Sequence, residues 1–292
     1  MTEDTDRVAV DARDPAEVFG LLAAEARVDV LRALADHPQD AVSFSGLFAA
    51  VDAVRDSGNF SYHLEKLRGA FVREADGGYA LTHAGRQVVG AIHAGSYTAD
   101  AAVDPVDVGW HCQRCGGRMT VAYADGAASM ECRDCGSGAR IPLPPATVDQ
   151  VDRSAFPEAA AAWYHQRVRR TLDGFCADCT GRIDAELVSA PTADGPSLAE
   201  FSCPRCGRTA TLSGTTIATF HPVVEGFLVE HGFDTTAHHP SQIWPELDDT
   251  AVSVRSRDPI ALTVRFEHGG EAVSVDVAPD ASVETVDRSP VE

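Results

Sequence analysis

Two ten-residue stretches decide how most of this chain folds: WHCQRCGGRM at 110–119 and GFCADCTGRI at 174–183. Each has an aromatic residue just before a Cys-x-x-Cys pair, and each continues as Cys-x-Gly-Arg and an apolar residue. A further Cys-x-x-Cys pair follows, after the sixteen residues 116–131 in the first case and the 23 residues 180–202 in the second. This likeness indicates an internal duplication, although two independent solutions to the same turn would look alike.

The eight cysteines therefore form four pairs of identical spacing: Cys112/Cys115, Cys132/Cys135, Cys176/Cys179 and Cys203/Cys206. A Cys-x-x-Cys turn points two thiolates at one place, and a second turn across a hairpin completes a tetrahedral set of four sulfurs that suits Zn²⁺. Disulfides would not persist in a reducing cytoplasm. We therefore predict two zinc ribbons with two structural Zn²⁺ ions; a redox or iron role and catalytic zinc are the alternatives.

Two further signals around the cysteines agree with zinc ribbons. Strand-like runs occupy 118–123 and 183–188, between the paired cysteines. Glycines follow the cysteine pairs where the chain must fold over a metal: Gly116, Gly117, Gly136, Gly181 and Gly207. All the predicted ligands are cysteines, so four thiolates fill each expected set and no open coordination site is visible.

Residues 14–100 have a different pattern, of helices with a late hairpin. Asp14-Pro15 predicts a helix start, and further helices are expected over 26–36 and 44–51. The expected buried positions are Val18, Leu21 and Leu22 in the first of these helices and Val28, Leu31 and Leu34 in the second. Two short strands surround Gly77-Gly78 within 72–81, and Thr82 caps a last helix bearing Val88, Val89 and Ile92.

A fourth helix of this region, capped at Asp56-Ser57, has two contrasting faces. Its apolar stripe predicts a core: Phe60, Leu64, Leu67 and Phe71. Its opposite face is small, polar and basic: Gly58, Asn59, Tyr62, Glu65, Lys66 and Gly69, flanked by Ser61 and Arg68. Such a face suits a helix in a DNA major groove, and a merely solvated face is the alternative. The order of elements predicts a winged helix-turn-helix.

These residues resemble a known family. The run 19–34 is similar to the opening of ArsR-type repressors, and FSYHLEKL at 60–67 is similar to their recognition helix. With paired Cys₄ modules, the chain resembles haloarchaeal winged-helix regulators. The resemblance covers about 14–95 and implies dimeric, sequence-specific binding to double-stranded DNA, often under control of an effector. The first cysteine of this chain is Cys112, so the metal sensing of that family, which uses Cys or His within the winged domain, is not implied, and the effector is open.

The distribution of charge along the chain indicates where DNA contacts are expected. Forty-four acidic residues against 24 basic ones give −20, and Lys66 is the only lysine, a composition like that of salt-in halophilic archaea. Residues 54–73 form a local island of +2. We expect base contacts from Asn59, Ser61, Tyr62 and Lys66, and backbone contacts from Arg55, Arg68 and Arg73. With no apolar run long enough for a membrane span and an acidic start, we expect a cytoplasmic protein.

The remaining segments complete a multidomain α+β prediction. We divide the chain into a tail (1–13), a winged helix-turn-helix (14–100), zinc ribbon 1 (106–145), a helical linker (146–172), zinc ribbon 2 (173–217) and a small C-terminal α+β end-piece (218–292). The linker carries Arg167, Arg169 and Arg170, which form either a clamp on the DNA backbone or a solvated face paired with neighbouring acids. In the end-piece we expect a helix over 222–231 and strands over 251–257, 260–266, 272–277 and 282–286.

Function follows from these parts. No nucleophile elbow, phosphate-binding glycine loop with Lys or His-Glu-x-x-His motif occurs, so we predict that the chain is not an enzyme. The leading hypothesis is a sequence-specific transcription regulator that acts as a homodimer. The alternatives are a general transcription or assembly factor resembling archaeal transcription factor E, and a metalloenzyme or RNA-processing factor. The histidines His221, His231, His238 and His239 match no zinc template, and His63 and His83 are expected to pack or cap.

Overall fold

The computed structural model describes residues 10–188, 198–236 and 238–291. The chain divides into two compact units, Met1–Ala99 and Asp100–Glu292. The predicted α+β class is confirmed: the described residues form helices and four small antiparallel sheets. Most of the predicted tail, residues 1–9, and the last residue of the predicted end-piece lie outside the described residues. In the described part of the chain, no helix combines the length and the apolar character needed to cross a bilayer.

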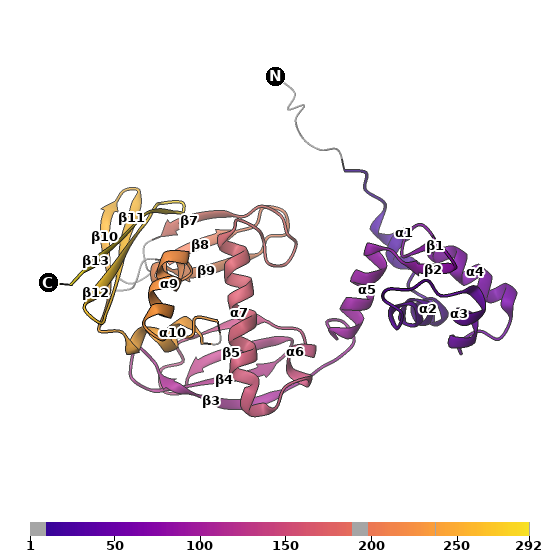
Figure 1. Cartoon of the computed structure of the whole chain (residues 1–292), viewed down its shortest axis with the longest axis horizontal. Coiled ribbons are helices and arrows are strands. Elements are labelled where there is room, and N and C mark those ends of the chain that lie inside the picture. Colours follow the sequence, from indigo (N-terminus) through magenta and orange to yellow (C-terminus); the bar gives the residue numbers. More distant parts are fainter. Residues whose placement is uncertain (1–9, 189–197, 237, 292) are drawn as a thin grey trace, which may run out of the picture. The chain divides into compact units, whose positions relative to one another are not determined.

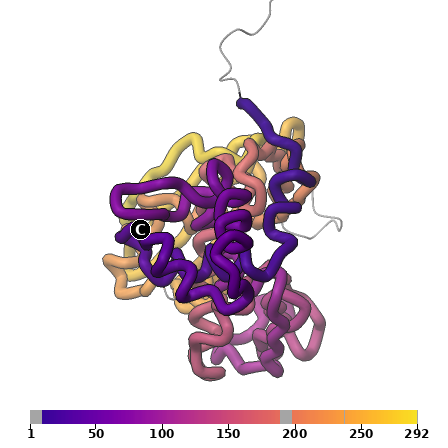
Figure 2. The backbone as a smooth tube through the Cα atoms, turned by 90° about the vertical axis from the view of Figure 1, so that its right-hand side faces the viewer, coloured from indigo at the N-terminus to yellow at the C-terminus, as the bar shows by residue number. Residues whose placement is uncertain are grey.

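The first unit consists of helices followed by a hairpin and a closing helix (Figures 1 and 2). Its elements are α1 (Pro15–Gly20), α2 (Glu25–Ala35), α3 (Phe44–Ala50), α4 (Ser57–Leu67), β1 (Val72–Ala75), β2 (Gly78–Leu81) and α5 (His83–His93). Side chains at the helix starts accept backbone N–H groups, as expected for caps: Asp14, Ser43, Asp56 and Thr82. Gly77 and Gly78, both at positive φ, form the turn of the hairpin.

The core of this unit contains the predicted stripe of α4. Phe60 and Leu67 are fully buried, and Leu64 and Phe71 nearly so. Two details of the prediction were wrong. Val28 of α2 is only half-buried, because the inward face of that helix is formed by Ala26, Val30, Leu31 and Leu34. Leu21 and Leu22 lie beyond the end of α1, yet they still pack against the core.

The second unit contains three sheets and the long helix α7 (Figure 1). The first sheet has the order β3 (Val103–His111), β4 (Arg118–Ala124), β5 (Ala127–Cys132) and β6 (Gly138–Pro142). It is followed by α6 (Ala146–Asp149), a 3₁₀ turn at Arg153–Ala155, and α7 (Phe156–Leu172). The second sheet has the order β7 (Asp184–Val188), β8 (Leu198–Ser202) and β9 (Thr209–Ser213).

The third sheet follows two helices, α8 (Gly214–Thr219) and α9 (Pro222–Glu230), then α10 (Pro240–Ile243) and a 3₁₀ turn at Trp244–Glu246. Its order is β10 (Asp249–Arg257), β11 (Ile260–His268), β12 (Glu271–Val277) and β13 (Val283–Pro290). The four predicted strands of this region are confirmed, and His268 pairs with Glu271 across the predicted Gly-Gly turn. β11 and β12 alternate buried with half-buried residues, which is the pattern of a sheet with one covered face.

Helix α7 joins the cores of the second unit. Near its start, Phe156 and Ala160 pack with Val121 and Tyr123 of the first sheet. Near its end, Val168 belongs to a much larger core shared by β7–β9, α8, α9 and the inner face of β11 and β12. The predicted boundary between 217 and 218 falls inside α8, and the strands on both sides of it bury their side chains together.

Candidate metal centres and the surrounding contacts

Four sulfur atoms meet at one end of the first sheet. Cys112 follows β3, Cys132 ends β5, and Cys115 and Cys135 lie in the turns after them. The Sγ atoms of Cys112 and Cys135 are 3.8 Å apart, and those of Cys115 and Cys132 are 3.5 Å apart. A tetrahedral Zn²⁺ with Zn–S bonds of about 2.3 Å requires sulfurs roughly 3.8 Å apart. These four residues are therefore positioned to bind one metal ion.

The second sheet has an equivalent arrangement. The Sγ atoms of Cys176 and Cys206 are 3.6 Å apart, and those of Cys179 and Cys203 are 3.5 Å apart. Cys176 and Cys203 are buried, whereas Cys206 is exposed. In both groups the ligand atoms all lie within 4.8 Å of one another. Among the described residues, only these two groups bring three or more His, Cys, Asp or Glu side chains together in this way.

All four Cys-x-x-Cys turns share one backbone conformation. The first cysteine donates its N–H to the carbonyl five residues later, and its own carbonyl accepts the N–H of the fourth residue on. That fourth residue is at positive φ in every turn: Gly116, Gly136, Thr180 and Gly207. Gly117 and Gly181 are not at positive φ; a Cβ at Gly117 would meet the Asp134 side chain at 2.4 Å, and one at Gly181 would lie 3.3 Å from the Cys179 Sγ. Thr180 takes the left-handed position where the other turns have glycine.

Backbone N–H groups of its turn favour the thiolate form of Cys132. The N–H groups of Cys135 and Asp134 lower the pKa of Cys132 to about 7. At Cys115 the Gly117 N–H acts in the same direction, but the neighbouring thiols of Cys135 and Cys132 raise the pKa to about 12. Without a metal, therefore, Cys115 keeps its proton at neutral pH. Metal binding must displace this proton, which makes binding weaker as the pH falls.

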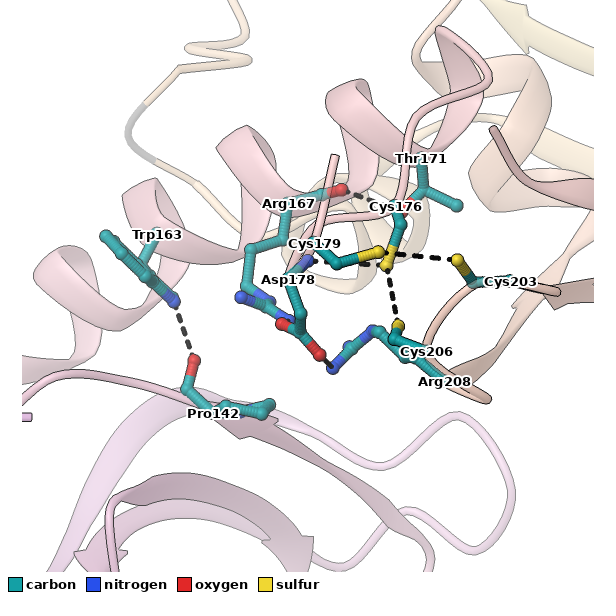
Figure 3. A network of polar contacts seen from close by, with 10 residues as sticks. All are labelled: Pro142, Trp163, Arg167, Thr171, Cys176, Asp178, Cys179, Cys203, Cys206 and Arg208. Carbon is teal, nitrogen blue, oxygen red and sulfur yellow. Dashed lines mark hydrogen bonds and ion pairs between the residues drawn. The ribbon is translucent and has the colours of Figure 1, made fainter. Parts of the chain in front are cut away.

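A charged bridge attaches the second Cys₄ group to α7 (Figure 3). Asp178, inside the first Cys-x-x-Cys turn, accepts hydrogen bonds from Arg167 at 2.7 Å and from Arg208 at 2.5 Å. Burial alone would raise the pKa of Asp178, but the two guanidinium groups lower it below its usual value. Arg167 is only 13% exposed and Arg208 20%, so the bridge is shielded from water on the arginine side.

Ion pairs within the second unit bear on the two interpretations of the linker arginines. Arg167 pairs with Asp178, and Arg169 pairs with Glu225 of α9. Two of the three basic residues of α7 are thus held by acids of the same unit. The expected paired face is confirmed for these two. The sequence signalled the arginines but not Asp178, whose role depends on contacts 11 and 30 residues away.

The residues predicted to contact DNA lie on the surface of the first unit. Asn59, Ser61 and Tyr62 are exposed on α4, and Lys66 places its ammonium group 5.6 Å from the centre of the Tyr62 ring. Arg55 precedes α4, and Arg73 lies on β1; both are exposed. Arg68 follows α4 and forms ion pairs with Glu65 and Glu74, the latter at 2.8 Å.

The histidines considered at the sequence level have local roles. His221 and His239 accept backbone N–H groups at the starts of α9 and α10, and His231 lies beside the carbonyl of Phe227. The carbonyl of His238 contacts the His165 ring at 2.9 Å. His63 packs edge-on against Tyr62, and His83 is exposed at the start of α5.

The two units correspond to two recognised sequence families. Residues 109–283 match the domain of unknown function DUF7351, and residues 15–92 match the domain of unknown function DUF7347. The first match covers more than half of the chain and includes both Cys₄ groups and most of the third sheet. The chain therefore belongs to the DUF7351 family. Searches of curated proteins and of solved structures gave no match.

Proposed function

We propose that the chain is a sequence-specific DNA-binding regulator whose first unit is a winged helix-turn-helix. One observation carries the proposal: α4 buries one face completely and exposes an opposite face of small, amide, hydroxyl and basic side chains. The order of three helices, α4, a hairpin and a closing helix supports it. A helix of this kind enters a major groove and is flanked by a hairpin wing on the phosphate backbone.

The exposed side chains divide naturally between base and backbone contacts. Asn59, Tyr62 and Lys66 carry groups that hydrogen-bond base edges, together with Ser61. Arg55 and Arg73 bind phosphates on either side. Arg68 is held by Glu65 and Glu74, so it reaches phosphate only by exchanging these partners. With so few cations the dependence of binding on salt is shallow, which suits an acidic protein in concentrated salt.

The DNA proposal is tested in two steps. Chromatin immunoprecipitation defines the bound sites: discrete sites support a specific regulator, whereas occupancy of nearly every promoter supports the general-factor alternative. Gel shifts at fixed high salt then compare the wild type with Asn59→Ala and Tyr62→Ala. Each is expected to weaken binding to the preferred site by about 1–3 kcal/mol and to relax base preference, whereas Arg73→Ala weakens all sequences alike.

Matched variants decide whether α4 reads the bases. Gln87→Ala changes an exposed polar residue of α5 and should leave binding unaltered. The Asn59→Ala/Tyr62→Ala/Lys66→Ala triple variant, with a wild-type melting curve and wild-type affinity, would contradict the proposal.

We also propose that both metal ions are Zn²⁺ and structural. An all-thiolate tetrahedral set at these sulfur distances suits Zn²⁺ and leaves no open position for a substrate. Elemental analysis of the reduced protein should give two zinc ions per chain. Less than one zinc per chain, with oxidised thiols, would contradict it.

We further propose that the regulator acts as a homodimer, as the resemblance to ArsR-type repressors implies, with two copies of α4 meeting half-sites about one helical turn apart. Of the predicted α5 stripe, Val89 is buried in the core of its own unit, whereas Val88 and Ile92 keep part of their surface exposed. Light scattering in multimolar salt should give twice the mass of one chain at micromolar concentration, and a monomer would refute the dimer.

A further inference from the structure

The second unit contains a pocket that none of the preceding functions uses. It has a volume of about 320 Å³ and lies between the first sheet, the N-terminal half of α7 and the segment 238–242. Ligand pockets of proteins start at about 300 Å³, so the space admits a small organic molecule. Its lining comes from three parts of the sequence that only the fold brings together.

Three rings form part of the pocket lining. Trp110 at the end of β3 stacks on His239, with ring centroids 5.9 Å apart and planes within 8° of parallel. Tyr164 of α7 packs against the same imidazole at a centroid distance of 4.4 Å, with its plane tilted by 40°. All three residues line the pocket, and Trp110 is half-buried. Flat, partly covered aromatic surfaces of this kind favour stacking with another flat ring.

Apolar side chains of the first sheet form another part of the lining. Val121, Ala128, Met130 and Ile141 line the space. Val121 and Ala128 are buried, and Met130 is a flexible, polarisable side chain that adapts its shape to a ring. Gln242 adds an amide that can orient a ligand by hydrogen bonding. The lining thus combines apolar side chains of the sheet with several polar groups.

The charged groups of the lining are acidic. Asp107 and Glu158 both line the pocket, and its described lining includes no Lys or Arg. His239 adds no charge, because burial lowers its pKa to about 3. Its Nδ1 accepts the Ser241 N–H, so the neutral ring carries its proton on Nε2 and is a donor there. An anion would face two carboxylates, of which Asp107 has a partner outside the lining, the Arg118 guanidinium at 3.9 Å.

We propose that this pocket binds a planar aromatic molecule that is uncharged or carries a single positive charge. The stacked rings and the apolar sheet select flatness, and Asp107 and Glu158 select against carboxylates and phosphates. The proposal concerns only the second unit, so it stands or falls independently of DNA binding.

A matched series of probes tests both parts of the proposal. Quinoline, 4-aminoquinoline and quinoline-4-carboxylate share one ring system and are neutral, cationic and anionic at neutral pH. Isothermal titration into the reduced, metal-loaded full chain should show one site per chain for the first two. The carboxylate should bind at least tenfold more weakly. Absence of binding by every probe, or equal binding of all three, would overturn the proposal.

Variants that fill the pocket locate the binding. Ala139 lines the pocket from β6 and is exposed, so Ala139→Trp should fill the space and weaken quinoline binding at least tenfold. Ser154→Trp, also at an exposed lining position but in the 3₁₀ turn before α7, should do the same. Ala124→Trp is the control, because Ala124 is exposed on the same sheet but outside the lining. Wild-type affinity in both filling variants would overturn the assignment.

One further variant tests the charge selection. Glu158 is exposed in the first turn of α7, and Glu158→Gln preserves its size. The preference for 4-aminoquinoline over the carboxylate should fall at least threefold in this variant, while quinoline affinity stays within twofold. An unchanged ratio would show that the carboxylates do not select the ligand and would overturn that part of the proposal.

Discussion

The two Cys₄ sheets share the same turns but differ in what lies behind the metal site. In the first sheet, Cys112 and Cys132 form a small apolar cluster of their own with Met119, separate from the core at the other end of the strands. In the second sheet, Leu187, Phe201 and Leu212 belong directly to the largest core of the molecule. The same Cys₄ motif thus occurs both on a sheet with a small separate cluster behind the metal site and on a sheet whose side chains belong to the large core.

The largest expected effect comes from removing one metal ligand in each sheet. Cys132→Ser and Cys203→Ser should each cost several kcal/mol, a large part of the roughly 10–16 kcal/mol that zinc supplies to small Cys-rich sites. Hydrogen exchange should increase only around 108–119 and 130–138 in Cys132→Ser. In Cys203→Ser it should also increase in β11 and β12, because their core is shared with β7–β9.

Cys132→Ser and Cys203→Ser serve as controls for each other. Each variant should lose one of two metal ions by elemental analysis and leave exchange in the first unit unchanged. Equal, purely local increases in both variants would show that the shared core is not a route of coupling.

A smaller effect is expected from the bridge that only the second sheet has. Asp178→Ala leaves Arg167 and Arg208 without their carboxylate; because Asp178 itself is 44% exposed, we expect a loss of about 1–2 kcal/mol in unfolding free energy. The corresponding position of the first sheet is Arg114, which is exposed, and Arg114→Ala should change little. Chemical denaturation of the metal-loaded protein measures both.

The loss of unfolding free energy in Asp178→Ala depends on pH in a direction that the pKa of Asp178 defines. The arginines lower the pKa of Asp178 in the folded state, so its contribution is present above the unfolded value and lost as the pH falls through the lower folded value. The difference between wild type and Asp178→Ala should therefore be constant between about pH 6 and 9. A difference that varies across this range would contradict the ion-pair explanation.

The smallest effect concerns the left-handed position of the turns. Thr180 has φ 59°, where a residue with a Cβ is strained by roughly 1–2 kcal/mol. Thr180→Gly should stabilise the second site by about 1 kcal/mol or less, since it also loses the hydrogen bond from Thr180 Oγ1 to the Cys179 carbonyl. Gly116→Thr in the first sheet should destabilise by a similar amount. A Cβ at Gly116 meets nothing within 4 Å, so only backbone strain contributes.

The rates at which the two sites lose metal to a chelator measure the effects of Thr180→Gly and Gly116→Thr. Thr180→Gly should slow the loss from the second site, and Gly116→Thr should speed it from the first. Two changes of the same direction would contradict the explanation by backbone strain.

The part of this structure that could be predicted is the part encoded locally. The four cysteine pairs, the stripe of α4 and the strands β10–β13 depend on spacing within a few residues, and each was found from the sequence. The first sheet was underestimated, because β3 has irregular pairing around Pro105 and a left-handed Gly109 that hide its alternation. The short strand β6 begins with Gly138, which gives no strand signal.

The non-local features could not be predicted. Nothing near His239 in sequence indicates that it stacks on Trp110 and packs against Tyr164, and nothing near Asp178 indicates its two arginine partners. Such contacts depend on how α7 lies across two sheets. The metal ligands were therefore predictable, whereas the pocket and the bridge required the fold.

The positions of the tryptophans have a spectroscopic consequence. All three belong to the second unit: Trp110 beside the first Cys₄ group, Trp163 donating to the Pro142 carbonyl, and Trp244 donating to Thr219. The first unit contains tyrosines but no tryptophan. Selectively excited indole emission therefore reports on the second unit alone, and unfolding of the first unit is silent in it. The stabilities of the two units can be separated in the intact chain by comparing this emission with far-ultraviolet circular dichroism.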